Sequence, residues 1–273
     1  MDRKATARET LAIMEQGYYE ANGIRVDIRK QQDDSVNKSV LLTPEQGGKI
    51  LKNYEKSAKA QDRETACTVL NCGAVDAILK LAGEGKQAAV LNFASAKNPG
   101  GGFLNGAMAQ EESLAVSSCL YRTQLAHEEY YVENRAFRSM MYTDYAIWSP
   151  DVVFFRDGRF RLMEHPVTAS VLTLPAVNMG QVLLKGEDEA KAEKVMKRRM
   201  ALSLAIFAHQ ECGYLILGAY GCGVFRNDPE KIAGWWKELL EGAFAGVFRT
   251  VVFAVLDPSS TGTCIGAFER VFG

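Results

Sequence analysis

The chain has 273 residues, of which 47% are apolar and 24% charged, and its formal net charge is −1. This length and composition suit a large α/β unit whose core needs neither disulfides nor metals. The balance of 32 basic and 33 acidic residues argues against a general polyelectrolyte binder, which would carry a basic excess. Local donors must therefore recognise any anionic substrate.

The first residues are charged, and no apolar signal region follows them. No apolar run of the sequence is long enough to span a bilayer. The six cysteines lie apart with no CxxC pair, which is typical of free thiols in a reducing compartment. We therefore expect a cytoplasmic protein.

The N-terminal part differs in pattern from the rest of the chain. It predicts a helix over 8–19, a turn at Asn22-Gly23, a strand over 24–28 and a polar helix over 45–60. We interpret residues 1–64 as an accessory segment, a helical extension packed on a main domain of residues 65–273.

Short apolar runs alternate with helical stretches from about residue 65 onward. The predicted strands are 67–70, 88–93, 152–155, 171–177, 214–219 and 250–256, and the predicted helices are 75–82, 112–127, 189–209 and 229–242. This alternation predicts a three-layer α/β/α domain with a mostly parallel central sheet. In such sheets ligands bind beyond the carboxyl ends of the strands, so we expect the site in the loops after Phe93, Val177 and Ala219.

The loop after Phe93 contains three consecutive glycines, and after seven intervening residues Gln110-Glu111-Glu112 opens a predicted helix. Consecutive glycines cost conformational entropy and are useful where the backbone must take positive φ or approach a ligand closely. Acids at a helix N-terminus can simply complement the helix dipole. Adjacent residues on a helix point roughly 100° apart, so the two acids would have unequal roles.

A second glycine-rich loop follows the strand predicted at 214–219. Its central residues are Gly221, Cys222, Gly223, Val224 and Phe225, and Arg226 is the nearest cation. A Gly-x-Gly turn between a strand and a helix presents consecutive backbone N–H groups that can bind an anion, although it can also be a simple tight turn. Two such loops at one sheet edge suit a nucleotide diphosphate bound across it.

Other candidates are weaker. Asn178 follows the strand predicted at 171–177 and would either line the same pocket or form a turn before Gly180. The three histidines have no metal-binding spacing, so we expect neither a metal nor a cofactor. The tyrosine-rich stretch over 128–145 is a candidate lid.

Taken together, the Asn-Pro-Gly-Gly-Gly loop at 98–102 and the Gln-Glu-Glu at 110–112 resemble the signature of poly(ADP-ribose) glycohydrolases. The stretch at 92–99 and the Gly-Cys-Gly-x-Phe-x-Asn-Asp-Pro at 221–229 are similar to the bacterial branch of that family. The resemblance implies a macrodomain-like fold that binds ADP-ribose, and hydrolysis of the ribose–ribose O-glycosidic bonds of the polymer.

The resemblance also implies residue roles. Glu112 would be the general acid/base, Glu111 would hold a ribose, and Asn98 would bond ribose hydroxyls beside the scissile bond. Phe225 would pack over a ribose or the adenine. The remaining substrate-binding residues would be Gly100, Gly101, Gly102, Gln110, Asn178, Gly221, Cys222, Gly223 and Val224, with the two sets of glycines around the diphosphate.

Two alternatives share the nucleotide loops. A non-catalytic ADP-ribose reader would be indifferent to the loss of Glu112, and a mono-ADP-ribosyl hydrolase would act on a protein or nucleobase linkage with the same acid. The expected partners are poly(ADP-ribose) or ADP-ribosylated protein as substrate and ADP-ribose as product. We expect neither a membrane nor an extended nucleic-acid surface as a partner.

Overall fold

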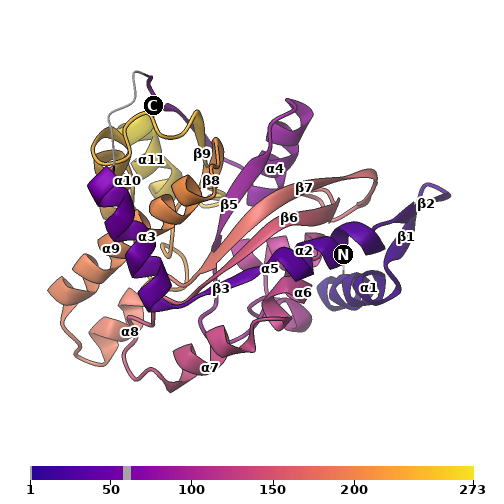
Figure 1. Ribbon diagram of the computed structural model, residues 1–273, viewed down its shortest axis with the longest axis horizontal. Coiled ribbons are helices and arrows are strands. Elements are labelled where there is room, and N and C mark those ends of the chain that lie inside the picture. Colours follow the sequence, from indigo (N-terminus) through magenta and orange to yellow (C-terminus); the bar gives the residue numbers. More distant parts are fainter. Residues whose placement is uncertain (1, 58–62) are drawn as a thin grey trace.

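The structure is a computed structural model that describes residues 2–57 and 63–273. Within these residues its centre is a seven-stranded sheet with the strand order β3-β6-β7-β5-β8-β9-β4 (Figure 1). The strands are β3 (Val40–Leu42), β4 (Ala66–Leu70), β5 (Ala88–Phe93), β6 (Ala146–Arg156), β7 (Leu162–Leu174), β8 (Tyr214–Leu217) and β9 (Thr250–Ala254). Neighbours from β7 to β4 pair in parallel, while β6 is antiparallel to β3 and β7. The expected mostly parallel sheet is confirmed.

Helices cover both faces of this sheet (Figure 1). One layer contains α3 (Pro44–Ser57), α9 (Glu189–His209), α10 (Pro229–Glu241) and α11 (Thr263–Phe272), and the other contains α4 (Ala74–Gly83), α5 (Gln110–Ser117) and α6 (Leu120–Leu125). On the central strand β5, Val90 packs into the second layer and Leu91 into the first. Because successive side chains of a strand point to opposite faces, a strand buried on both sides is mainly apolar. The expected three-layer α/β/α fold is therefore confirmed.

The N-terminal part begins with α1 (Arg3–Gln16), β1 (Tyr18–Ala21), β2 (Ile24–Asp27) and α2 (Arg29–Lys38). The helix predicted over 8–19 is displaced: the Asp2 carboxylate caps its start and Gly17, at φ 76°, ends it. The next two tyrosines belong instead to a hairpin that turns at Asn22 and Gly23, where the sequence predicts a turn.

The third strand joins the N-terminal part to the main sheet. Strand β3 pairs with β6 as an edge strand, although the sequence pattern indicates neither β3 nor α2. The helix predicted over 45–60 is found as α3 (Pro44–Ser57), and residues 58–60 lie outside the described residues. The division of the chain at residue 64 stays a prediction.

The helix predicted over 112–127 is wrong, because two helices occupy this range. Between α5 and α6, Ser118 takes an extended conformation and forms a bridge with Phe154 of β6. Its hydroxyl donates to Leu114 O and accepts from the N–H of Leu120, so it ends one helix and begins the next. The break turns α6 back toward the loop after β5.

Smaller corrections concern the ends of other elements. Strand β7 ends at Leu174, three residues before its predicted end, because Pro175 has no N–H to continue the ladder. The sequence pattern does not indicate three of the helices, which are α7 (Glu128–Ala136), α8 (Met179–Leu184) and α11. None of the helices in the described part of the chain has the length and apolar character needed to cross a membrane.

The stretch predicted as a lid is held against the core in this structure. Helix α7 buries the side chains of Tyr130 and Tyr131. The segment after it is fixed by Arg199, a buried residue of α9 that donates to Asp144 Oδ1 at 2.9 Å and to the carbonyl oxygens of Met141 and Tyr142. In this structure the stretch is therefore packed against the core and does not form an open lid.

Candidate active site

Three loops meet at the carboxyl edge of the sheet because β7, β5 and β8 are parallel neighbours. They are the loops at 94–109, 175–178 and 218–228, as the sequence predicts. The rings of Phe93, at the end of β5, and Tyr220, in the third loop, lie with their centroids 5.3 Å apart. This contact joins the first and third loops at their base.

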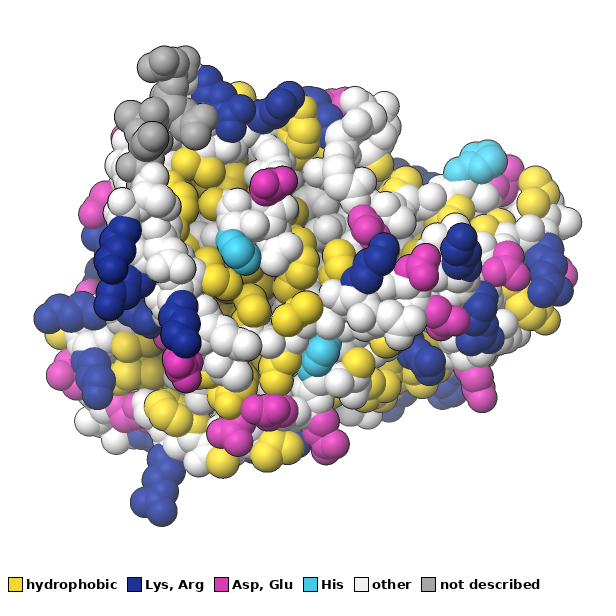
Figure 2. Space-filling view, viewed as in Figure 1, with side chains coloured by type: hydrophobic (Ala, Val, Ile, Leu, Met, Phe, Trp, Pro, Cys, Tyr) yellow, Lys and Arg dark blue, Asp and Glu magenta, His cyan; other side chains and the backbone are white. Residues whose placement is uncertain are grey.

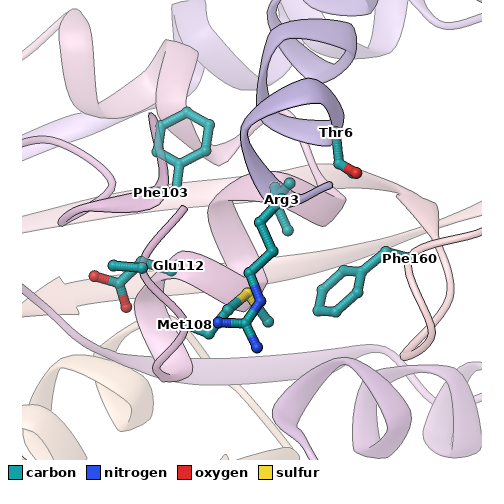
Figure 3. A pocket seen from close by; sticks show the side chains of 8 residues that line it. Arg3, Thr6, Phe103, Met108, Glu112 and Phe160 are labelled. Carbon is teal, nitrogen blue, oxygen red and sulfur yellow. The ribbon is translucent and has the colours of Figure 1, made fainter. Parts of the chain in front are cut away.

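Glu112 is the third residue of α5 and is half-buried. Its Oε1 accepts from the N–H of Gly102 at 2.9 Å, and its Oε2 accepts from the N–H of Ala109 at 3.0 Å. The carboxylate therefore caps its own helix and also holds the last of the three glycines. In Figure 3 it points away from Arg3 and Phe160, which line a small pocket on the other side of the Glu112 side chain.

The triple glycine makes room for both acids. Gly101 has φ 59°, and a Cβ atom there would lie 2.3 Å from Glu112 Oε1 and 3.1 Å from Glu111 Oε2. Gly100 has φ 64°, and a Cβ atom there would lie 2.7 Å from the ring of Phe103. Any other residue at these positions would be strained in its backbone and would push against its neighbours.

The N–H groups of the triple glycine already have partners inside the protein. The N–H of Gly100 donates to Gln124 Oε1 at 2.9 Å, that of Gly101 to Asn98 O at 3.1 Å, and that of Gly102 to Glu112. Asn98 itself is exposed. The contacts of this loop with a diphosphate, and of Asn98 with a ribose, stay predictions.

Glu111 points into the protein, and its side chain is 3% exposed. Its Oε1 accepts from Asn92 Nδ2 at 3.1 Å and from Gln124 Nε2 at 2.8 Å, and its Oε2 accepts from the N–H of Ser95 at 2.6 Å. Burial raises the pKa of Glu111 to about 8, against the lowering effect of these donors. This environment differs from that of the half-buried Glu112, which supports unequal roles for the two acids. The predicted contact of Glu111 with a ribose stays a prediction.

This raised pKa predicts how stability depends on pH. Between about pH 4.5 and pH 8 the unfolded chain has lost the Glu111 proton while the folded chain keeps it. The free energy of unfolding therefore falls as pH rises through this window, by about 1.4 kcal/mol per pH unit from this group. Glu111→Gln cannot titrate, so the stability advantage of the wild type over this variant should shrink between pH 5 and pH 8.

Urea unfolding of both proteins at several pH values checks this expectation. Glu45→Gln, at an exposed glutamate of α3, controls for the substitution itself. Parallel stability profiles for wild type and Glu111→Gln would show that Glu111 ionises in the folded protein as it does in the unfolded chain.

Gln110 anchors the start of α5 to the edge of β5. Its Oε1 accepts from the N–H of Phe93 at 2.9 Å, and its Nε2 donates to Leu91 O at 2.8 Å. Both polar atoms of this side chain are thus engaged with the strand. Its predicted place among the substrate-binding residues stays a prediction.

The second glycine-rich loop has a fixed base and an exposed tip. At the base, Asn227 Nδ2 donates to Val177 O at 2.8 Å and to Gly221 O at 3.1 Å. Gly221 has φ 75°, and a Cβ atom there would lie 2.6 Å from that same nitrogen. At the tip, Gly223 is exposed and the Val224 side chain is 83% exposed.

This loop carries several free backbone donors. Within the part of the chain that the structure describes, the following N–H groups donate no hydrogen bond: those of Gly221, Gly223, Val224 and Phe225. A cluster of free N–H groups forms an anion-binding site even without a basic side chain. The geometry therefore favours the second loop, rather than the triple glycine, as the binding site for a phosphate group.

Three further predicted residues belong to this part of the sheet edge. The ring of Phe225 lies 5.9 Å from that of Tyr142. The Asn178 side chain accepts from the N–H of Gln181 at 3.2 Å and so caps α8, which is the turn-forming alternative. Contact with the Cys264 thiol, together with burial, raises the pKa of the Cys222 thiol well above its ordinary value, which argues against a reactive thiolate.

Four residues that hold the site together were missed by the sequence analysis: Asn92, Ser95, Gln124 and Asn227. Asn92, Ser95 and Asn227 lie inside the stretches that carry the family resemblance, so their position was a usable signal. Gln124 had no such signal, because it lies within a predicted helix, 24 residues from Gly100. The described residues contain no group of three or more His, Cys, Asp or Glu that could hold a metal ion.

Residues 7–157 match the family described as microbial-type PARG, catalytic domain. This match covers more than half of the chain and includes the triple glycine and both acids. The chain belongs to the microbial-type PARG family. No curated protein matches it.

Solved structures of this family are similar along nearly the whole chain. Poly(ADP-ribose) glycohydrolase (PARG) from Thermomonospora curvata is 39% identical, with 99% of each chain covered and a TM-score of 0.95. The same enzyme bound to the inhibitor ADP-HPD matches with a TM-score of 0.91 over 98% of each chain, at 39% identity. PARG from Deinococcus radiodurans in complex with ADP-ribose is 40% identical, with 88% of this chain and 96% of that chain covered and a TM-score of 0.83. The second glycine-rich loop, which lies outside the family match, thus falls within the structural similarity.

Proposed function

We propose that this protein hydrolyses the ribose–ribose O-glycosidic bonds of poly(ADP-ribose) and releases ADP-ribose, with Glu112 as the general acid/base. The observation that carries the proposal is the half-buried Glu112 carboxylate at the start of α5, at the same sheet edge as the free N–H groups of the second loop. Membership of the microbial-type PARG family supports it, as does similarity to a solved relative in complex with ADP-ribose.

In this proposal the diphosphate of the substrate binds at the second glycine-rich loop. The free N–H groups at 221–225 hold the diphosphate, so recognition needs no basic stripe, in keeping with the net charge of −1. On the face shown in Figure 2, basic and acidic side chains are mixed over the right-hand part of the molecule. This distribution does not favour a long nucleic acid as the substrate.

The chemical step uses one acid. Glu112 protonates the oxygen of the leaving ribose while the anomeric carbon gains oxocarbenium character, and the resulting carboxylate then activates water. The N–H groups of Gly102 and Ala109 fix the carboxyl group, and each carboxyl oxygen keeps a second lone-pair site, which can carry the transferred proton or accept a hydrogen bond from water. Glu111 is buried and accepts three hydrogen bonds from within the protein, so the two acids do not flank one bond as the carboxylates of ordinary glycosidases do.

Release of ADP-ribose from purified poly(ADP-ribose), measured by chromatography, tests this proposal. We expect free ADP-ribose from the wild type. Mono-ADP-ribosylated protein and ADP-ribosylated DNA are assayed in parallel, because a hydrolase for those linkages would share the pocket and the acid. A wild-type protein that binds ADP-ribose but releases none from the polymer would contradict the proposal. The protein would then be either a non-catalytic ADP-ribose reader or a hydrolase for mono-ADP-ribose linked to protein or DNA.

A further inference from the structure

The side chain of Gln124 connects Glu111 to the triple-glycine loop. It is a fully buried residue of α6, the helix created by the break at Ser118. Its Nε2 donates to Glu111 Oε1 at 2.8 Å, and its Oε1 accepts from the N–H of Gly100 at 2.9 Å. One side-chain amide thus spans two segments that each contribute to the site.

The two ends of the glycine loop are held by different groups. The N–H of Gly102 donates to Glu112, so the acid itself holds the far end. At the near end Gly100 is held by Gln124, and between them Gly101 fits only because it has no side chain to meet either acid. The position of the Glu112 carboxylate relative to the loop therefore depends on both ends being fixed.

We propose that Gln124 is a positioning residue for the reaction, because it fixes the triple-glycine loop and Glu111 relative to each other and thereby sets the place of the Glu112 carboxylate. This inference rests on the proposed glycohydrolase function. Gln124 is fully buried and bonds to Glu111, so it acts through the acids and not by contact with the substrate. Catalysis is sensitive to small displacements of a reacting group, and a shift of about 1 Å can cost about 100-fold in rate.

Gln124→Met tests this role, since methionine has nearly the same shape and neither an amide donor nor an amide acceptor. The matched control is Gln32→Met on α2, because Gln32 is equally buried and its Nε2 donates to Met14 O at 3.0 Å. A second variant, Gln124→Asn, keeps the amide but is too short to span both partners. Gln124→Asn tests the same role if the methionine variant folds poorly.

Three measurements are made on each variant. Hydrogen–deuterium exchange of the segment at 95–102 reports whether the N–H groups of the loop stay bonded. Steady-state kinetics on poly(ADP-ribose) and equilibrium binding of ADP-ribose separate positioning from affinity. For both Gln124 variants we expect faster exchange in this segment and a kcat lowered by about 10- to 100-fold, with the affinity for ADP-ribose little changed. Gln32→Met should match the wild type in all three.

The outcomes separate this inference from the proposed function. Wild-type exchange in the loop of both Gln124 variants overturns the inference whether or not the wild type acts on the polymer. Faster exchange with a wild-type kcat also overturns it, because the bonds would then be structural only. Faster exchange in a protein whose wild type releases no ADP-ribose supports the coupling through Gln124 and rejects the glycohydrolase function.

Discussion

Glu112→Gln is expected to lower the rate of ADP-ribose release from the polymer by about 100- to 10,000-fold, the range typical for loss of a positioned general acid/base. Glutamine has the same shape but cannot transfer a proton in either direction. Its amide oxygen can still accept from one of the two N–H groups that now face the carboxylate, those of Gly102 and Ala109. Binding of ADP-ribose should therefore survive, with a loss of stability of about 1 kcal/mol from the weaker helix cap.

Chromatographic assay of released ADP-ribose and calorimetric binding of ADP-ribose, on the same preparations, check this result. Glu189→Gln is the matched control, because Glu189 is an exposed glutamate in the first turn of α9, outside the site. It should keep the wild-type rate. A Glu112→Gln protein that retains most of the wild-type activity would remove Glu112 from the chemical step. Loss of both binding and activity would assign it a structural role instead.

Gly101→Ala is expected to lower activity by about 100-fold or more, since a displacement of about 1 Å at the reacting group has that effect. The new Cβ atom would lie 2.3 Å from Glu112 Oε1 at a residue with φ 59°, so the carboxylate has to move or the loop has to shift. The strain and the overpacking should also lower the free energy of unfolding by about 2 kcal/mol. This substitution thus moves the acid without changing it.

Gly234→Ala provides the comparison. Gly234 lies inside α10, and a Cβ atom there would meet nothing within 4 Å. Alanine in that helix should stabilise the protein by about 0.5–1 kcal/mol and leave the rate unchanged. The rate of ADP-ribose release and the thermal unfolding of both variants test this expectation. A Gly101→Ala protein as active as the wild type would show that the loop yields without moving Glu112.

Local patterns in the sequence were enough to predict six of the seven strands of the central sheet, whereas the family resemblance implied the candidate acid. The strand β5 and the helix α9 have their predicted ends, because burial on both faces and apolar spacing are properties of neighbouring residues. The two glycine-rich loops and the Gln-Glu-Glu triplet are likewise contiguous, so their positions at the ends of strands could be inferred from the alternation alone. The break at Ser118 could not be inferred in this way, since a bridge to a distant strand sets it.

The tertiary structure decided what each group at this edge can do. Only the packing of α5 against β5 and α6 turns Glu111 inward onto Asn92 and Gln124. Only the folded loops show that the triple glycine has used its N–H groups while the loop at 221–225 keeps several free. Several of these partners come from different elements of the fold, such as Asn92 of β5 and Gln124 of α6 around Glu111. A single sequence records which residues are present but not which hydrogen bonds the topology allows them to make.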